Sequence, residues 1–432
     1  MRRAIGPDGP IGFSDGNDGV KTIATDALAA RMLAHDARID RDSDARLNPL
    51  RRADGSPDRI GGSRRPLSTT DVAPPSASTA AGRTSRRWLR DAPIMWLLAL
   101  LGVVLVAGPG FTDSLAPWPF LISFILLGMP HGAMDLWVAG RLPEADSAEG
   151  PPSLLDVATW RTAIGRFGGY LGWMGVSLAM LLIVPDLTIA LFLMLTIVHW
   201  GLGDQWATQR REMRVAPGWW IAGAFIAARG CLVLGPAFAH DPAAAWAPFA
   251  TVASFGAGSS LADPSVLGPV GATLLAIGVV LAVAAAIWRW RHDGLRGAVL
   301  DLVEHTLVAL LCFTASPLFG VGCYFMFVHS WRHAVRLGTC PTLVGSAAAR
   351  HPASGLLRVH GLSLPLLVPT GFICLVAAWH LEAPPSTFAI SAAMIAFFMI
   401  STLPHHLLGL KLPGSRPLAR LRTWRSAAAD PT

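Results

Sequence analysis

The chain has 432 residues, of which 52% are hydrophobic and only 15% are charged, and its formal net charge is +7. Charged residues make up about a quarter of ordinary soluble domains, so this composition argues against a soluble globular protein. Almost all of the positive charge is arginine in tails and short loops, which indicates membrane topology instead of nucleic-acid binding.

The first segment, residues 1–90, mixes Asp, Arg, Gly, Ser and Pro and contains almost no aromatic side chains. Such a segment cannot bury enough apolar surface to form a core, so we predict a disordered polar tail. Arg2 and Arg3 are not followed by an apolar stretch, which argues against a cleaved export signal. We therefore expect this tail to lie in the cytoplasm.

Apolar runs of membrane-crossing length follow within residues 91–412. A crossing helix needs about 20 residues, and in lipid the backbone must satisfy its own hydrogen bonds. The sequence therefore predicts an all-α fold, a polytopic bundle of about ten transmembrane helices. The predicted spans are residues 93–111, 117–140, 167–185, 187–208, 217–238, 266–291, 298–316, 318–336, 359–380 and 387–410.

A further apolar stretch at residues 245–260 is rich in Ala, Gly and Ser. Arg289, Arg291 and Arg296 obey the positive-inside rule only if this stretch does not cross the bilayer. We predict a short external re-entrant or surface segment there, with both termini cytoplasmic in a cell (inner) membrane protein. Residues 413–432 then form a basic cytoplasmic tail.

Five stretches place polar side chains at membrane depth, where they are costly and are usually functional. In the predicted topology all of them fall in the cytoplasmic half of their helices, so their side chains share one layer. They are PHGAMD (130–135), HWGLGD (199–204), Glu304-His305, HSWRH (329–333) and PHH (404–406).

The chemistry of this layer indicates a metal site. His329 and His333 are four residues apart, so they share one helix face and can bind the same ion. A single intramembrane histidine is more often a helix-to-helix hydrogen bond, but five in one layer favour a metal. Metal-bound histidines usually donate their other N–H to a carboxylate or carbonyl group. The candidate carboxylates are Asp135, Asp204 and Glu304, and Arg332 is interpreted as structural.

These motifs, in this order on a polytopic chain, resemble the Brp/Blh family of bacterial and archaeal β-carotene 15,15′-dioxygenases. The resemblance extends over roughly residues 117–410. It implies Fe(2+) ligated by the four catalytic histidines His131, His199, His329 and His333. It also implies insertion of O2 across the central double bond of β-carotene, which gives two retinal molecules.

The remaining site residues are expected around these ligands. His405 lies in a motif shared with the family, and we group it with Asp135, Asp204 and Glu304 as support for the ligands. A carotenoid dissolved in the lipid membrane can reach a site among helices sideways. Five aromatic neighbours of the ligands are expected to line its path: Trp137, Trp200, Tyr324, Phe325 and Trp331.

Three other functions use similar residues. A membrane di-iron desaturase or hydroxylase acting on a lipid typically has about eight histidines in several HxxxH and HxxHH boxes. Only five or six histidines are available here within the spans, with a single HxxxH. A bis-histidine haem protein would show a Soret band. A transporter could use the His/Asp layer as a proton or metal-ion relay, although no internal repeat of the spans is apparent.

Overall fold

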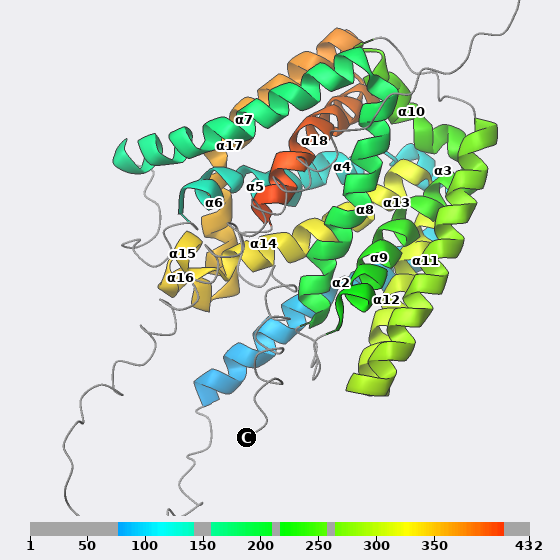
Figure 1. Ribbon diagram of the computed structural model, residues 1–432, viewed down its shortest axis with the longest axis vertical. Coiled ribbons are helices and arrows are strands. Elements are labelled where there is room, and N and C mark those ends of the chain that lie inside the picture. Colours follow the sequence, from blue (N-terminus) through cyan, green and yellow to red (C-terminus); the bar gives the residue numbers. More distant parts are fainter. Residues whose placement is uncertain (1–76, 142–156, 210–216, 257–263, 410–432) are drawn as a thin grey trace, which may run out of the picture. The chain divides into compact units, whose positions relative to one another are not determined.

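A computed structural model describes residues 77–141, 157–209, 217–256 and 264–409, and every element in these ranges is a helix (Figure 1). The predicted all-α membrane bundle is thus confirmed. The elements are α2 (Ala77–Ala107), α3 (Pro109–Ser114), α4 (Trp118–Ser123), η2 (Phe124–Gly128), α5 (Met129–Ala133), α6 (Asp135–Arg141), α7 (Val157–Ile183), α8 (Pro185–Gln209), α9 (Trp219–His240), α10 (Pro242–Ala253), α11 (Pro264–Asp293), α12 (Leu295–Thr314), α13 (Pro317–Tyr324), η4 (Phe325–Ser330), α14 (Trp331–Gly338), α15 (Pro341–Val344), α16 (Ser346–Arg350), α17 (Pro352–Leu381) and α18 (Thr387–Gly409).

The number of long apolar helices is smaller than the predicted ten. Within the described ranges, seven helical stretches are long and apolar enough to cross a membrane, and two shorter apolar helices cover residues 91–107 and 167–183. The predicted span 318–336 is a continuous helical run of α13, η4 and α14. It is not among the seven because its arginine and histidine side chains lower its mean hydropathy.

Two boundaries of the predicted domains differ from the structure or lie outside it. Helix α2 begins at Ala77, so residues 77–90, which we predicted as part of the disordered tail, are helical. Residues 1–76 and the predicted C-terminal tail at 413–432 lie outside the described residues. The apolar stretch predicted at 245–260 corresponds largely to α10, whose 12 residues are too few to cross a bilayer.

Glycines bring α8 and α9 into close contact. A methyl group added to Gly201 on α8 would collide with the backbone of Ile226 on α9. Conversely, a methyl group at Gly230 on α9 would collide with the backbone of Ile197 on α8. Small residues at helix interfaces allow such close approach in membrane proteins. This contact fixes α8, and with it His199, against α9, which also packs on α11 and α12 (Figure 1).

The last helix, α18, connects several parts of the bundle. It packs against α7, α8, α10 and α17, and α17 in turn packs on α5 and α14. The histidine-bearing helices α5, α8, α14 and α18 are therefore held together by neighbours that are distant in sequence.

Candidate metal centre

Five histidines from separate segments form one buried cluster. The ring centroids of His329 and His333 lie 5.1 Å apart, and His199 lies 4.9 and 5.7 Å from them. His131 lies 5.7 and 5.1 Å from the same two rings. His405 lies 4.9 Å from His199 and 5.4 Å from His131. The structure thus brings together side chains that are up to 274 residues apart, from position 131 to position 405.

Hydrogen bonds fix the orientation of three of these rings. His131 Nδ1 donates to the backbone carbonyl of Leu127 at 2.8 Å, which leaves Nε2 with its lone pair. His405 Nδ1 lies 2.7 Å from Asp135 Oδ2, so a neutral His405 ring that donates from Nδ1 would likewise carry its lone pair on Nε2. His199 Nδ1 lies 3.3 Å from Nδ1 of His406. Such bonds to the outer nitrogen are typical of metal-bound histidines because they select the tautomer.

The cluster fits a metal ion. His199, His329 and His333 each offer a nitrogen, and these three atoms lie within 4.8 Å of one another. Imidazole nitrogens bind a metal ion at about 2.1 Å, so an ion would hold these three atoms at most about 4.2 Å apart, as close as they are now or slightly closer. Among the described residues neither nitrogen of buried His329 has a hydrogen-bond partner. Because leaving buried polar atoms unpaired is costly, a bound ion explains this arrangement.

Two π-helical segments position the candidate ligands. Segment η2 ends at Gly128, three residues before His131, and η4 contains His329 and ends next to Trp331. A π-turn inserts an extra residue into a helix and rotates the side chains that follow, and such turns are frequent at functional sites. Hydrophobic periodicity does not reveal them, so sequence reasoning predicted regular helices here.

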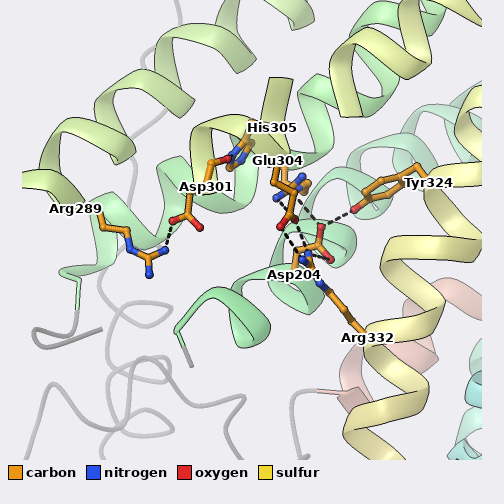
Figure 2. Close-up of polar contacts among 8 residues, drawn as sticks. Asp204, Arg289, Asp301, Glu304, His305, Tyr324 and Arg332 are labelled. Carbon is orange, nitrogen blue, oxygen red and sulfur yellow. Dashed lines mark hydrogen bonds and ion pairs between the residues drawn. The ribbon is translucent and has the colours of Figure 1, made fainter. Parts of the chain in front are cut away.

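A buried ionic cluster lies directly beside the histidines. Arg332, between His329 and His333 in the chain, contacts Glu304 through two bonds of 2.7 and 2.8 Å (Figure 2). Asp204 lies 3.2 Å from Arg332, and Tyr324 donates a hydrogen bond of 3.0 Å to Asp204. Arg229 lies 3.0 Å from Asp204 and 2.6 Å from Glu304. Two carboxylates and two guanidinium groups, all fully buried, thus give zero net charge.

This cluster changes the interpretation of two predicted supporting residues. Asp204 and Glu304 contact arginines and a tyrosine, whereas we had expected them to accept hydrogen bonds from ligand histidines. Asp135 does contact a histidine, but this is His405, which we had predicted as another supporting residue and not as one of the four ligands. The physical reason is that a buried carboxylate is best stabilised by a full opposite charge, and arginine supplies it with two parallel donors. Arg332 is structural, as interpreted from the sequence.

An apolar cavity of about 310 Å³ adjoins the histidines. His131, His199, His329 and His405 form part of its wall, and most of the remaining lining is apolar. Leu171 on α7 and Ile373 on α17 also line it, and they are 54% and 58% exposed. Since exposed apolar residues of a membrane bundle face lipid, the cavity has a mouth between α7 and α17.

Of the five aromatic residues expected along this path, only Trp200 and Phe325 line the cavity. Trp137 donates a hydrogen bond to the carbonyl of Leu362 and packs in a separate core. Tyr324 belongs to the ionic cluster, and Trp331 packs edge-on against Trp96. Neighbours in sequence point to different sides of a helix, so adjacency to a ligand could not select the cavity-facing residues.

Sequence reasoning missed three residues of the site. Arg229 has no motif around it, and its charge in an apolar helix was the only available signal. Tyr170 lines the cavity and also interacts with the Asp135 carboxyl group. His406 contacts His199, although only its neighbour His405 was considered as a site residue.

Comparison with known proteins identifies the family. A model of the family described as beta-carotene 15,15′-dioxygenase matches residues 122–412, which is more than half of the chain. The chain belongs to the β-carotene 15,15′-dioxygenase family. All five clustered histidines lie within the matched range. As a member, the protein is a multi-pass membrane enzyme of a carotenoid-cleaving family.

The similarity to a relative agrees with this membership. The probable β-carotene 15,15′-dioxygenase Blh of Halobacterium salinarum is 27% identical over 354 residues, covering 77% of this chain and 95% of the relative. No solved structure matches the chain significantly. The site geometry of this family member is therefore described by the present structure alone.

Proposed function

We propose that the protein is an integral-membrane, non-haem iron(II) dioxygenase that cleaves the central double bond of β-carotene. One β-carotene and one O2 give two retinal molecules, because the C=C and O=O bonds break and each new carbonyl receives one oxygen atom. No external reductant is needed. The observation that supports this best is a buried histidine cluster on the wall of an apolar cavity that opens toward lipid.

In this proposal His131, His199, His329 and His333 hold Fe(2+). Neutral imidazole ligands suit iron(II), and four of them leave positions open on the ion. When bound, iron supplies the means for O2 to react with a closed-shell alkene. The ionic cluster around Arg332 keeps α14 in place, so that His329 and His333 face His199 on α8.

The cavity walls bind and orient the substrate. Trp200 and Phe325 present aromatic surfaces beside the histidines, and their rings can contact a conjugated chain. A cavity of about 310 Å³ is at the lower end of the range for ligand sites, so it holds part of a long carotenoid. The remainder extends through the mouth between α7 and α17. The apolar lining also excludes water from the reacting atoms.

We further propose that the protein lies in the cell membrane with both termini in the cytoplasm, as the arginine distribution requires. A fluorescent protein fused after Thr432 should then be bright, because green fluorescent protein folds in the cytoplasm. Alkaline phosphatase fused at the same position should be inactive. The opposite pair of signals would place the C-terminus outside.

The direct test is expression in β-carotene-producing bacterial cells. Chromatography of pigment extracts should show loss of β-carotene and appearance of retinal or retinol with the wild type. A His329→Ala/His333→Ala variant should retain the carotene, since it lacks two ligands. A His380→Ala variant is the matched control, because His380 lies at the far end of α17, stacks on Phe255, and is outside the cluster.

Metal content separates the alternatives. The purified wild type should contain one iron per chain, whereas a di-iron desaturase or hydroxylase would contain two. Unchanged carotene with a folded, iron-loaded protein would eliminate β-carotene as the substrate. Unchanged carotene together with absence of any bound metal would eliminate the oxygenase and favour ion transport.

A further inference from the structure

His405 occupies the same cluster as the four proposed iron ligands. Its ring centroid lies 4.9 Å from His199, 5.4 Å from His131 and 5.9 Å from His333. Where two of the four proposed ligands contact each other, their ring centroids lie 4.9 to 5.7 Å apart. His405 is therefore about as close to three of these rings as the contacting ligands are to one another.

The nitrogen atoms of His405 are arranged as in a metal ligand. Nδ1 lies 2.7 Å from Asp135 Oδ2, so the proton of the neutral ring is on Nδ1 and the lone pair is on Nε2. Nε2 is buried, and it has no hydrogen-bond partner among the residues that the structure describes. A buried lone pair without a partner is unfavourable unless something binds it.

An unpaired nitrogen is not sufficient by itself, as His305 demonstrates. Its Nδ1 bonds to the Asp301 carbonyl at 2.7 Å, and its Nε2 is also buried and without a described partner. However, its ring packs edge-on against Phe225. His405 differs because its ring lies beside the imidazole rings of His131, His199 and His333. A small movement of its side chain could therefore bring Nε2 to an ion held by His199, His329 and His333, whose nitrogens are already close together.

Asp135 and Tyr170 hold His405 in this orientation. Asp135 begins α6 and is buried, and His405 comes from α18. Tyr170 on α7 interacts with the same carboxyl group and also lines the cavity. The Asp135 carboxylate thus connects α6, α7 and α18 and orients the His405 imidazole, as outer-shell partners of metal ligands do.

We propose that His405 is a fifth histidine ligand of the iron, oriented by Asp135; this rests on the proposed function. Five imidazole ligands would leave an iron ion little room for a further ligand. The carotenoid is then held by the cavity walls without bonding to the ion.

The test uses the full-length protein in detergent, stripped of metal and titrated with Fe(2+) or Co(2+). The His405→Gln variant should bind Fe(2+) at least tenfold more weakly than the wild type. Its Co(2+) complex should absorb visible light more strongly, because cobalt absorption increases as coordination number falls. Asp135→Asn should weaken Fe(2+) binding by about 10- to 100-fold. His305→Gln, the matched control, should leave affinity and spectrum unchanged.

A measurement on the wild type avoids the risk that a variant does not fold. In the Co(2+)-loaded protein, each ligand imidazole contributes one strongly shifted, exchangeable N–H proton resonance, so five such resonances are expected. Four resonances, or a His405→Gln variant that matches the wild type within twofold in Fe(2+) affinity, would overturn the inference. If one of these results is found and the wild type still cleaves β-carotene, the proposed function stands and only the role of His405 is wrong. Wild type that binds no iron would instead contradict the proposed function itself.

Discussion

At the scale of single residues, Gly203 is the position where the smallest change should disturb the metal site. A methyl group there would lie 3.2 Å from His329 Cε1 and 3.3 Å from His333 Cδ2. These contacts are tight, so the two imidazoles would have to shift by a few tenths of an ångström. We expect Gly203→Ala to lower Fe(2+) affinity about tenfold, as disturbance of ligand orientation commonly does.

Gly132 supplies the control for this substitution. It adjoins His131 in sequence and lines the cavity, yet a methyl group there would meet no atom within 4 Å. Gly132→Ala should therefore keep wild-type iron affinity in the same titration. Equal losses in both variants would show that the Gly203 contact is not the cause.

The chemistry of single residues explains which features of the site could be predicted from the sequence. Histidines and carboxylates are costly at membrane depth, so their presence alone predicted the cluster that the structure brings together. Their pairing was not predictable, because it depends on which helices become neighbours. Asp204 and Glu304 were expected to contact histidines. In the structure, Asp204 instead pairs with Arg229 on α9, and Glu304 pairs with Arg332 on α14.

At the scale of elements, the ionic cluster joins α8, α9, α12 and α14. Glu304 accepts hydrogen bonds from both Arg332 and Arg229. Glu304→Gln would leave two guanidinium groups buried beside one remaining carboxylate, and breaking a buried pair costs about 3–5 kcal/mol. We expect a large drop in the melting temperature in detergent, measured by circular dichroism, together with weaker iron binding.

A surface carboxylate is the comparison for this variant. Asp113 on α3 is exposed, and surface substitutions usually change stability by less than about 0.5 kcal/mol. Asp113→Asn should melt within error of the wild type. If Glu304→Gln did the same, the ionic cluster would not stabilise the helix contacts.

The short helix α10 contributes one aromatic ring to the cavity wall. Phe249 on α10 lines it, is 9% exposed, and packs on Phe192, whose ring centroid is 6.2 Å away. Phe192 precedes His199 by two turns of α8, or about 10 Å along the helix. We propose that this part of the wall sets how far one end of the substrate extends beyond the iron.

Phe249→Leu should therefore let the carotenoid slide deeper and shift part of the cleavage away from the central bond. Chromatography of the products should show apocarotenals of unequal length beside retinal. Phe238→Leu changes a buried ring that contacts Phe249 but does not line the cavity. That variant should yield retinal alone, and unequal products from it would argue against this part of the wall as the cause.

Helix positions were predictable from apolar length, but two features of the elements were not. The π-segments η2 and η4 arise from local packing and leave no periodic signature in the sequence. The mouth between α7 and α17 depends on which helices pack together, and this requires tertiary structure. Arginine positions did indicate that α10 does not cross the membrane, in agreement with its short length.

At the scale of the whole molecule, folding and metal binding rest on different contacts. Close glycine packing and the ionic cluster involve no metal, so removal of iron by a chelator should keep the helical content measured by circular dichroism. The melting temperature should fall, because an ion that binds only the folded state stabilises it by mass action. Loss of helical signal on chelation would show that the metal is required for the fold.

Zinc can distinguish the contribution of a bound metal to stability from its contribution to catalysis. Zn(2+) accepts imidazole ligands but has no redox chemistry. Reloading the stripped protein with Zn(2+) should restore the melting temperature without restoring β-carotene cleavage, whereas Fe(2+) should restore both. Cleavage by the zinc form would contradict an iron-dependent reaction.

The order of the four buried charges along the chain has a consequence for membrane insertion. Asp204 and Arg229 lie on the consecutive spans α8 and α9. Glu304 lies on α12, and Arg332 lies on α14, at the end of the helical run of α13, η4 and α14 that follows α12. A lone charge at the centre of an inserting helix costs about 2.5–3.5 kcal/mol. Each helical hairpin leaving the ribosome thus carries one acid and one base of the ionic cluster, and these two residues can enter the bilayer as a neutral pair. The two hairpins need to join only after both have been synthesised.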